Sequence, residues 1–296
     1  MGLEIKNLRK EYKNGVKAID NLNLTIANGM FGLLGPNGAG KSSLMRTIAT
    51  LQSVDSGSLY FNGIDVLNDP ISLRKVLGYL PQEFGVYPGV TADELLNYFA
   101  RLKGLQDPAQ RRSKINQVLE LTNLTADRDK HVHSYSGGML QRFGIAQLLL
   151  NQPNLIIVDE PTAGLDPAER RRFLNILREI GSENTVIFST HIVDDVRELC
   201  HDMAILNHGR IISHSRPETA IASLEGQIWS RSVAADQLQS LQKQYTVLSS
   251  QFNQDNSLSV RVYSPQQPSP EFFPVKADLD DVYFCALNES AGLPHV

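Results

Sequence analysis

The stretch Gly32–Ser43, GLLGPNGAGKSS, decides how the rest of the chain is interpreted. Residues 35–42 match the phosphate-loop pattern G-x-x-x-x-G-K-[ST] at every fixed position. Apolar residues before the loop predict a short buried strand, and residues 43–51 predict a helix. A glycine-rich turn that binds nothing is the plain alternative. The complete match in a strand-turn-helix context favours a phosphate site over that alternative.

Such a loop works through its backbone, because glycines let successive N–H groups converge on phosphate oxygens at a helix N-terminus. Lys41 is expected to reach the β- and γ-phosphates of ATP, and the Ser42 hydroxyl is expected to hold Mg²⁺. The nucleotide-binding residues predicted in this stretch are Gly35, Pro36, Asn37, Gly38, Ala39, Gly40, Lys41, Ser42 and Ser43.

Composition limits the possible classes of protein. A chain of 296 residues has room for one large domain with an appendage, or for two modest domains. The formal charge of −4 argues against non-specific nucleic-acid binding, so no nucleic-acid partner is expected. The two cysteines are far apart and predict neither a metal site nor a disulfide, which favours a reducing cytosol. No window is apolar enough to span a membrane, so a membrane role is expected to need another chain.

Polar residues follow several predicted strands and are candidates for the chemistry. Leu155–Asp159 predicts a buried parallel strand, at whose carboxyl end ligands gather. Asp159 is therefore a candidate Mg²⁺ ligand, and Glu160 a candidate for polarising the attacking water. A second buried strand ends at His191, which could hydrogen-bond a γ-phosphate and sense its presence.

Other candidates are weaker when taken singly. Tyr12 lies at a turn between alternating strands, where its ring could stack on a base, although turn tyrosines more often only pack. Ser136 is a good N-cap for a helix that opens with Gly137 and Gly138, and an exposed helix start binds anions. Gln82 follows a strand, and a solvated loop glutamine is its plain interpretation.

Taken in order, these elements resemble one family, the ATP-binding cassette (ABC) ATPases. The phosphate loop, Gln82, the YSGGM segment, LIIVDE, AGLD and His191 carry the resemblance over residues 2 to about 216. Tyr135 and Met139 stand where leucine and glutamine are usual, but the serine and both glycines of the signature are present.

The resemblance implies a head-to-tail dimer of two copies. The signature residues Ser136, Gly137 and Gly138 of one copy would bind the γ-phosphate held by Lys41 of the other, and Asp166 would communicate across the interface. It also implies that Gln82 contacts nucleotide and Mg²⁺ and, with the helical insertion after it, an integral-membrane permease.

The fold expected is α/β, a phosphate-loop ABC cassette with an antiparallel β subdomain, a parallel-sheet core and a helical subdomain, followed by a small C-terminal α+β appendage. Residues 1–218 are assigned to the ATPase domain, about 85–150 to its helical subdomain and 219–296 to the appendage, which is expected to be structural or to support dimerisation.

Segment 78–96 looks like that of cassettes serving export-type permeases for drugs, lipids or polysaccharides. The function expected is therefore Mg-ATP-driven transport from the cytoplasmic face of the membrane. Alternatives are a soluble or regulatory ABC ATPase not coupled to transport, or a nucleotide kinase, although a kinase would need neither the Ser-Gly-Gly segment nor His191.

Overall fold

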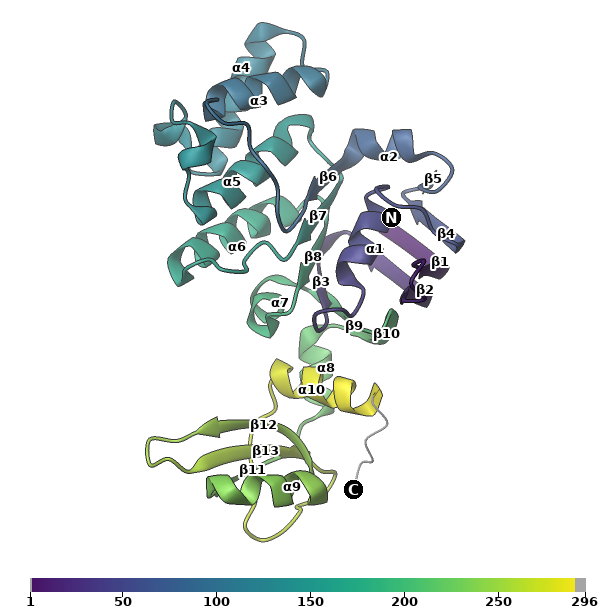
Figure 1. Ribbon diagram of the computed structural model, residues 1–296, viewed down its shortest axis with the longest axis vertical. Coiled ribbons are helices and arrows are strands. Elements are labelled where there is room, and N and C mark those ends of the chain that lie inside the picture. The colour runs from purple at the N-terminus through teal and green to yellow at the C-terminus, as the bar shows by residue number, and fades with distance from the viewer. Residues whose placement is uncertain (1, 291–296) are drawn as a thin grey trace.

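The computed structural model describes residues 2–290. A six-stranded sheet forms its centre (Figure 1), and five of the six strands run parallel. In spatial order the strands are β10 (Arg210–Ser215), β9 (Asp202–Asn207), β3 (Gly29–Leu34), β8 (Thr185–Thr190), β7 (Leu155–Asp159) and β6 (Leu77–Leu80). Strand β10 pairs antiparallel at one edge. Because β3, β7 and β8 run parallel, their carboxyl ends lie at the same end of the sheet, where a ligand site is expected.

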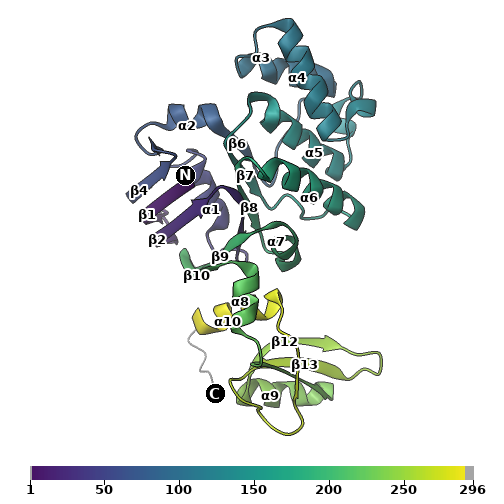
Figure 2. The same cartoon turned by 180° about the vertical axis from the view of Figure 1, so that it is seen from behind.

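Both faces of this sheet are buried, as the side chains of β3 show, since they point alternately to the two faces. Met30 and Leu34 pack in one hydrophobic cluster, whereas Phe31 and Leu33 pack in another. The first cluster lies under α5 (Gly137–Leu148), α6 (Pro167–Gly181) and α7 (Val193–Leu199), and the second under α1 (Lys41–Ile48). Figures 1 and 2 show α5, α6 and α7 on one side of the sheet and α1 on the other.

An antiparallel sheet closes the second cluster from outside. Its strands, in spatial order, are β2 (Lys17–Ala27), β1 (Gly2–Glu11), β4 (Ser56–Phe61) and β5 (Ile64–Asp65). Leu3, Ile5 and Leu8 of β1 point into the space beside α1 and are fully buried. This confirms the antiparallel strands that the alternating sequence predicts.

Two helices form the insertion between β6 and the signature segment. They are α3 (Ala92–Leu102) and α4 (Pro108–Leu121). Thr91 and Glu94 form a capping box at the start of α3, an arrangement that a threonine followed three residues later by a glutamate predicts. One short helix, α2 (Pro70–Val76), precedes β6 and was not predicted, because it buries only Leu73 and shows no apolar periodicity.

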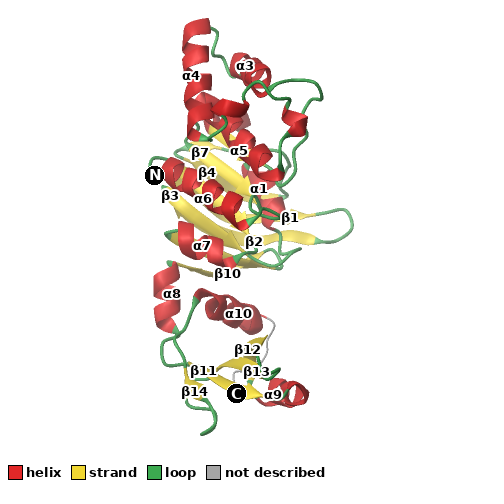
Figure 3. Cartoon of the chain, turned by 90° about the vertical axis from the view of Figure 1, so that its left-hand side faces the viewer, coloured by secondary structure: helices red, strands yellow, loops and turns green. Residues whose placement is uncertain are grey.

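The C-terminal part adds a third sheet at the end of the molecule opposite α3 and α4 (Figure 3). Its strands are β12 (Thr246–Phe252), β13 (Leu258–Tyr263), β11 (Ile228–Val233) and β14 (Phe273–Pro274), in that order, and its helices are α8 (Pro217–Ser223), α9 (Leu238–Gln244) and α10 (Leu279–Ser290). Residues 291–296 of the predicted appendage lie outside the described residues. Across residues 2–290, no helix combines the length and apolarity needed to cross a bilayer.

Candidate nucleotide site

The phosphate loop joins β3 to α1, and its glycines are needed for close approach. Gly40 is the N-cap of α1 at φ +107°, and a Cβ there would lie 2.2 Å from the Ala18 carbonyl oxygen. A Cβ on Gly35 would lie 2.3 Å from the Leu206 carbonyl oxygen. No side chain caps α1, so its first N–H groups are open to an anion.

Lys41 is buried at the start of α1 and bonds back onto its own loop. Its Nζ donates to the carbonyl oxygen of Gly35 over 2.7 Å and to that of Pro36 over 3.2 Å. The same Nζ lies 3.1 Å from Oε1 of Glu160. One lysine thus links the loop to the carboxyl end of β7.

Glu160 is the point where the loop, β7 and β8 converge. Its Oε2 lies 3.1 Å from Nδ1 of His191, and its backbone N–H donates to the Ser189 carbonyl oxygen over 2.9 Å. Its φ of +46° is in the left-handed region, which is unfavourable for a residue with a Cβ. The surrounding contacts therefore hold this carboxylate in a position that local preference alone would not choose.

Asp159 lies beside Glu160 and is 2% exposed. Burial raises the pKa of Asp159, an effect opposed by interactions with the Ser42 and Ser189 hydroxyls. Its Oδ1 is buried without a hydrogen-bond partner among the described residues. A buried oxygen without a partner beside a serine hydroxyl is a donor set that suits a hard divalent cation, so Ser42 and Asp159 fit Mg²⁺.

A cavity of about 500 Å³ opens in front of the phosphate loop. It brings together Tyr12, Gln82 and Glu160 from three separate parts of the chain. Val16 and Ala18 also line it, although no motif in the sequence marks either of them as a site residue. The remaining lining residues are Asn37, Gly38, Gly40, Lys41, Ser42 and Ser43.

The signature residues do not reach this cavity in the same chain. Ser136 caps α5, and its hydroxyl accepts from the Met139 N–H over 3.3 Å. Ser136 and Gly137 are exposed, whereas Gly138 is buried against Glu169 of α6. Asp166 does not line the cavity either; its side chain caps α6 by accepting from the backbone N–H groups of Ala168 and Glu169. These residues present a second surface, separate from the phosphate loop.

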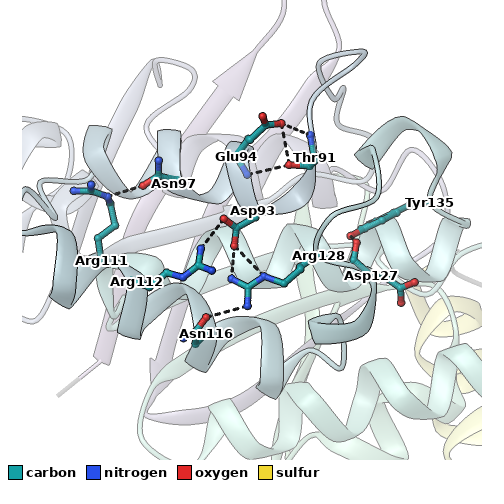
Figure 4. Close-up of polar contacts among 10 residues, drawn as sticks. All are labelled: Thr91, Asp93, Glu94, Asn97, Arg111, Arg112, Asn116, Asp127, Arg128 and Tyr135. Atoms are coloured by element: carbon teal, nitrogen blue, oxygen red, sulfur yellow. Dashed lines mark hydrogen bonds and ion pairs between the residues drawn. The ribbon is translucent and has the colours of Figure 1, made fainter.

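The segment leading to the signature is tied to the start of α3 (Figure 4). Asp93 accepts from Arg128 and, over 2.8 Å, from Arg112 of α4. The Tyr135 hydroxyl donates to the Asp127 carbonyl oxygen over 2.8 Å, and the Tyr135 ring packs edge-on against Phe143. Tyr135, which departs from the usual leucine, is therefore a packing residue with its hydroxyl bonded.

A buried carboxylate behind the site was not anticipated from the sequence. Asp195 of α7 is fully buried and accepts from the Thr162 hydroxyl and from Arg170 Nε, each over 2.6 Å. It joins the loop after Glu160 to α6 and α7. No periodicity or motif marks such an interior ion pair.

Comparison with known proteins decides the family. The sequence profile described as "ABC transporter" matches residues 19–163. The chain is 38% identical over 210 residues to the uncharacterized ABC transporter ATP-binding protein YxlF of Bacillus subtilis (strain 168), covering 71% of this chain and 69% of that protein. The chain belongs to the ABC transporter family.

Two further similarities agree with this membership. The cassette is 35% identical over 223 residues to a Nod factor export ATP-binding protein I of Cupriavidus metallidurans, covering 75% of this chain and 73% of that protein. The solved dimeric structure of MJ0796, a bacterial ABC transporter cassette, superposes with a TM-score of 0.66 at 27% identity, covering 72% of this chain and 98% of that one. This chain is thus an ATP-binding, ATP-hydrolysing subunit of an ABC transporter.

Proposed function

We propose that the cassette hydrolyses Mg-ATP between two copies arranged head to tail, and that this drives a separate export permease. The observation that carries the proposal is the convergence of Lys41 and His191 on the two oxygens of Glu160, at the wall of the phosphate-loop cavity. A basic group for phosphate, a carboxylate for water and a γ-phosphate sensor are then within one site.

ATP would compete for Lys41 with the bonds that the structure shows. Phosphate oxygens carry more charge than the Gly35 and Pro36 carbonyls, so Lys41 Nζ would turn to the β- and γ-phosphates. Its pairing with Glu160 would weaken, which frees that carboxylate to polarise a water for attack on the γ-phosphorus. As the water oxygen bonds to the γ-phosphorus, the water proton would pass to Glu160, and the bond from the γ-phosphorus to its bridging oxygen would break, so that ADP leaves with that oxygen.

The remaining predicted residues would complete the site. Ser42, Asp159 and Gln82 would hold Mg²⁺, which neutralises charge on the β- and γ-phosphates when bound. His191 would hydrogen-bond the γ-phosphate, and Tyr12 would stack on the base.

The second copy would supply Ser136, Gly137 and Gly138 to the γ-phosphate, with Asp166 at the interface. Within one chain none of these residues lines the phosphate-loop cavity, and Ser136 and Gly137 are exposed. An exposed helix start suits a phosphate from a partner, because its backbone N–H groups attract anions. The similar cassette MJ0796 is dimeric, which supports a dimer for this chain as well.

A permease would hold the dimer at the cytoplasmic face of the membrane. Beside the helical insertion, a groove of about 1230 Å³ lies between α2 and the two helices α3 and α4. Ile71 and Leu102 line it and are 67% and 66% exposed, with Lys103 and Lys114 beside them. Exposed apolar side chains rimmed by cations suit a permease segment. The similarity to a Nod factor export protein supports export.

We assign residues 1–218 to the ATPase and 219–296 to an accessory module.

Glu160→Gln tests the catalytic assignment. The amide cannot polarise water as a carboxylate does, so we expect the hydrolysis rate to fall by about 10²- to 10⁴-fold while ATP binding is retained. Glu183→Gln, an exposed position outside the cavity, is the matched control and should hydrolyse ATP at the wild-type rate. Wild-type turnover in Glu160→Gln would remove Glu160 from this role.

A further inference from the structure

The Tyr12 side chain is held by hydrogen bonds to its hydroxyl and by a cation over its ring. Its hydroxyl lies 3.0 Å from Ser43 Oγ and donates to Gln52 Oε1 over 3.0 Å. Lys10 Nζ stands 5.9 Å from the centroid of the Tyr12 ring. The side chain is 37% exposed and lines the phosphate-loop cavity. An exposed tyrosine would ordinarily sample several rotamers, but this one has a partner for its hydroxyl and a cation over its ring.

Gln52 connects this tyrosine to the helix that begins at Lys41. Its Nε2 donates to the Ser43 carbonyl oxygen over 2.7 Å and to the Thr47 hydroxyl over 2.8 Å. Both N–H groups of the amide thus hold α1, while its oxygen holds Tyr12. The planar amide fixes the distance between the ring and the first turn of α1.

Asp55 makes a second connection a few residues later. Its Oδ2 accepts from the Glu11 backbone N–H over 2.6 Å, and its Oδ1 lies 3.6 Å from Lys10 Nζ. Its own N–H donates to the Arg9 carbonyl oxygen over 2.9 Å. The loop after α1 is therefore attached to the end of β1 immediately before Tyr12.

These contacts invite two interpretations. In the first, they hold the β1–β2 turn against α1 and contribute only to stability. In the second, they also hold the Tyr12 ring in the position that a nucleotide base needs when its phosphates occupy the loop. Only the second makes affinity depend on whether the ligand carries a base. Ordering a side chain on binding costs about 0.5–1.5 kcal/mol, so a ring already held in place favours a base-bearing ligand by several-fold.

We propose that Gln52 is a positioning residue for the base: it holds Tyr12 at a fixed distance from the phosphate loop, so that the base and the triphosphate bind as one rigid unit. This rests on the proposed stacking role of Tyr12. Because Gln52 does not line the cavity, it acts only through Tyr12 and α1.

The test compares a ligand with a base and one without. Dissociation constants for Mg-ATP and for Mg-tripolyphosphate are measured by titration calorimetry on the full chain, for the wild type, Gln52→Leu, Tyr12→Phe and their double variant. We expect each single change to weaken ATP binding about three- to tenfold and to leave tripolyphosphate binding unchanged. The double variant should be no weaker than the worse single one, because both remove the same bond.

Gln242→Leu, an exposed position on α9, is the matched control and should change neither constant. Equal losses for ATP and tripolyphosphate in Gln52→Leu would overturn the proposal, since Gln52 would then merely support α1. Unchanged ATP affinity in Gln52→Leu would overturn it as well. Tyr12→Ala separates this from the stacking role: if it too leaves ATP affinity unchanged, stacking itself is wrong, whereas if it weakens ATP, only the positioning by Gln52 fails.

Discussion

At the scale of single residues, the proposed site depends on side chains held in unfavourable positions and on a glycine that no other residue can replace. Glu160 has a positive φ, and Asp159 keeps an oxygen without a partner in the interior among the described residues. Such positions are costly and persist only where the surrounding structure enforces them. Gly40 is a different case: glycine adopts its positive φ without strain, and both that φ and the nearby Ala18 carbonyl exclude a side chain.

Gly40→Ala should abolish ATP binding. It should also lower the free energy of unfolding by more than about 1 kcal/mol, which is the cost of placing alanine at a positive φ alone. The added Cβ would fall 2.2 Å from a backbone oxygen, so the loop must move. Gly104→Ala is the matched control, at φ +91° with nothing within 4 Å of the new Cβ. It should lose only the conformational term and bind ATP normally. Denaturant melts measure the free energy of unfolding, and titration measures ATP affinity. Equal losses of stability and of affinity in the two variants would refute the steric argument.

At the scale of elements, the helical subdomain is joined to the signature segment by hydrogen bonds as well as by packing. The Asp93 N–H donates to the Arg128 carbonyl, and the Val132 N–H donates to the Val90 carbonyl. The segment after the Gln82 loop is thus hydrogen-bonded to the segment before α5. A shift at one end of this connection is expected to reach Ser136.

Asp93→Ala should lower the free energy of unfolding by about 1–2 kcal/mol, because it removes charge-assisted bonds from Arg112 and Arg128 at a partly exposed position. It should also lower the ATPase rate, since the segment before Ser136 loses its anchor. Asp129→Ala, an exposed neighbour, is the control and should change neither. Thermal melts and phosphate-release assays measure the two effects. An unchanged rate in a destabilised Asp93→Ala would show that the network is structural only.

The long elements could be predicted from the sequence because their apolar periodicity is complete. Strands β3, β7 and β8, both helices of the insertion and the N-cap Ser136 follow the predicted pattern. The short helices α2 and α8 were missed, since each buries too few residues to leave a stripe. Gln52 and Asp195 could not be found either, because each acts through partners distant in sequence that only the fold brings together.

At the scale of the whole molecule, the C-terminal part is not packed independently of the cassette. Leu279, Val282 and Tyr283 of α10 belong to the same hydrophobic cluster as Val196 of α7 and Met203 of β9. Helix α7 follows His191 directly and carries Asp195, which holds the loop after Glu160. The proposed accessory module therefore lies against the elements that position Glu160 and His191, which supports the proposal of a structural role for it.

The proposed mechanism places ATP between two copies of the chain. The most direct measurement is the molar mass of Glu160→Gln in solution with Mg-ATP, by light scattering after size exclusion. We predict a species of twice the 32.8 kDa chain mass that forms only with ATP and that Ser136→Arg abolishes. A Glu160→Gln variant that binds ATP to saturation and remains a single copy would contradict the account.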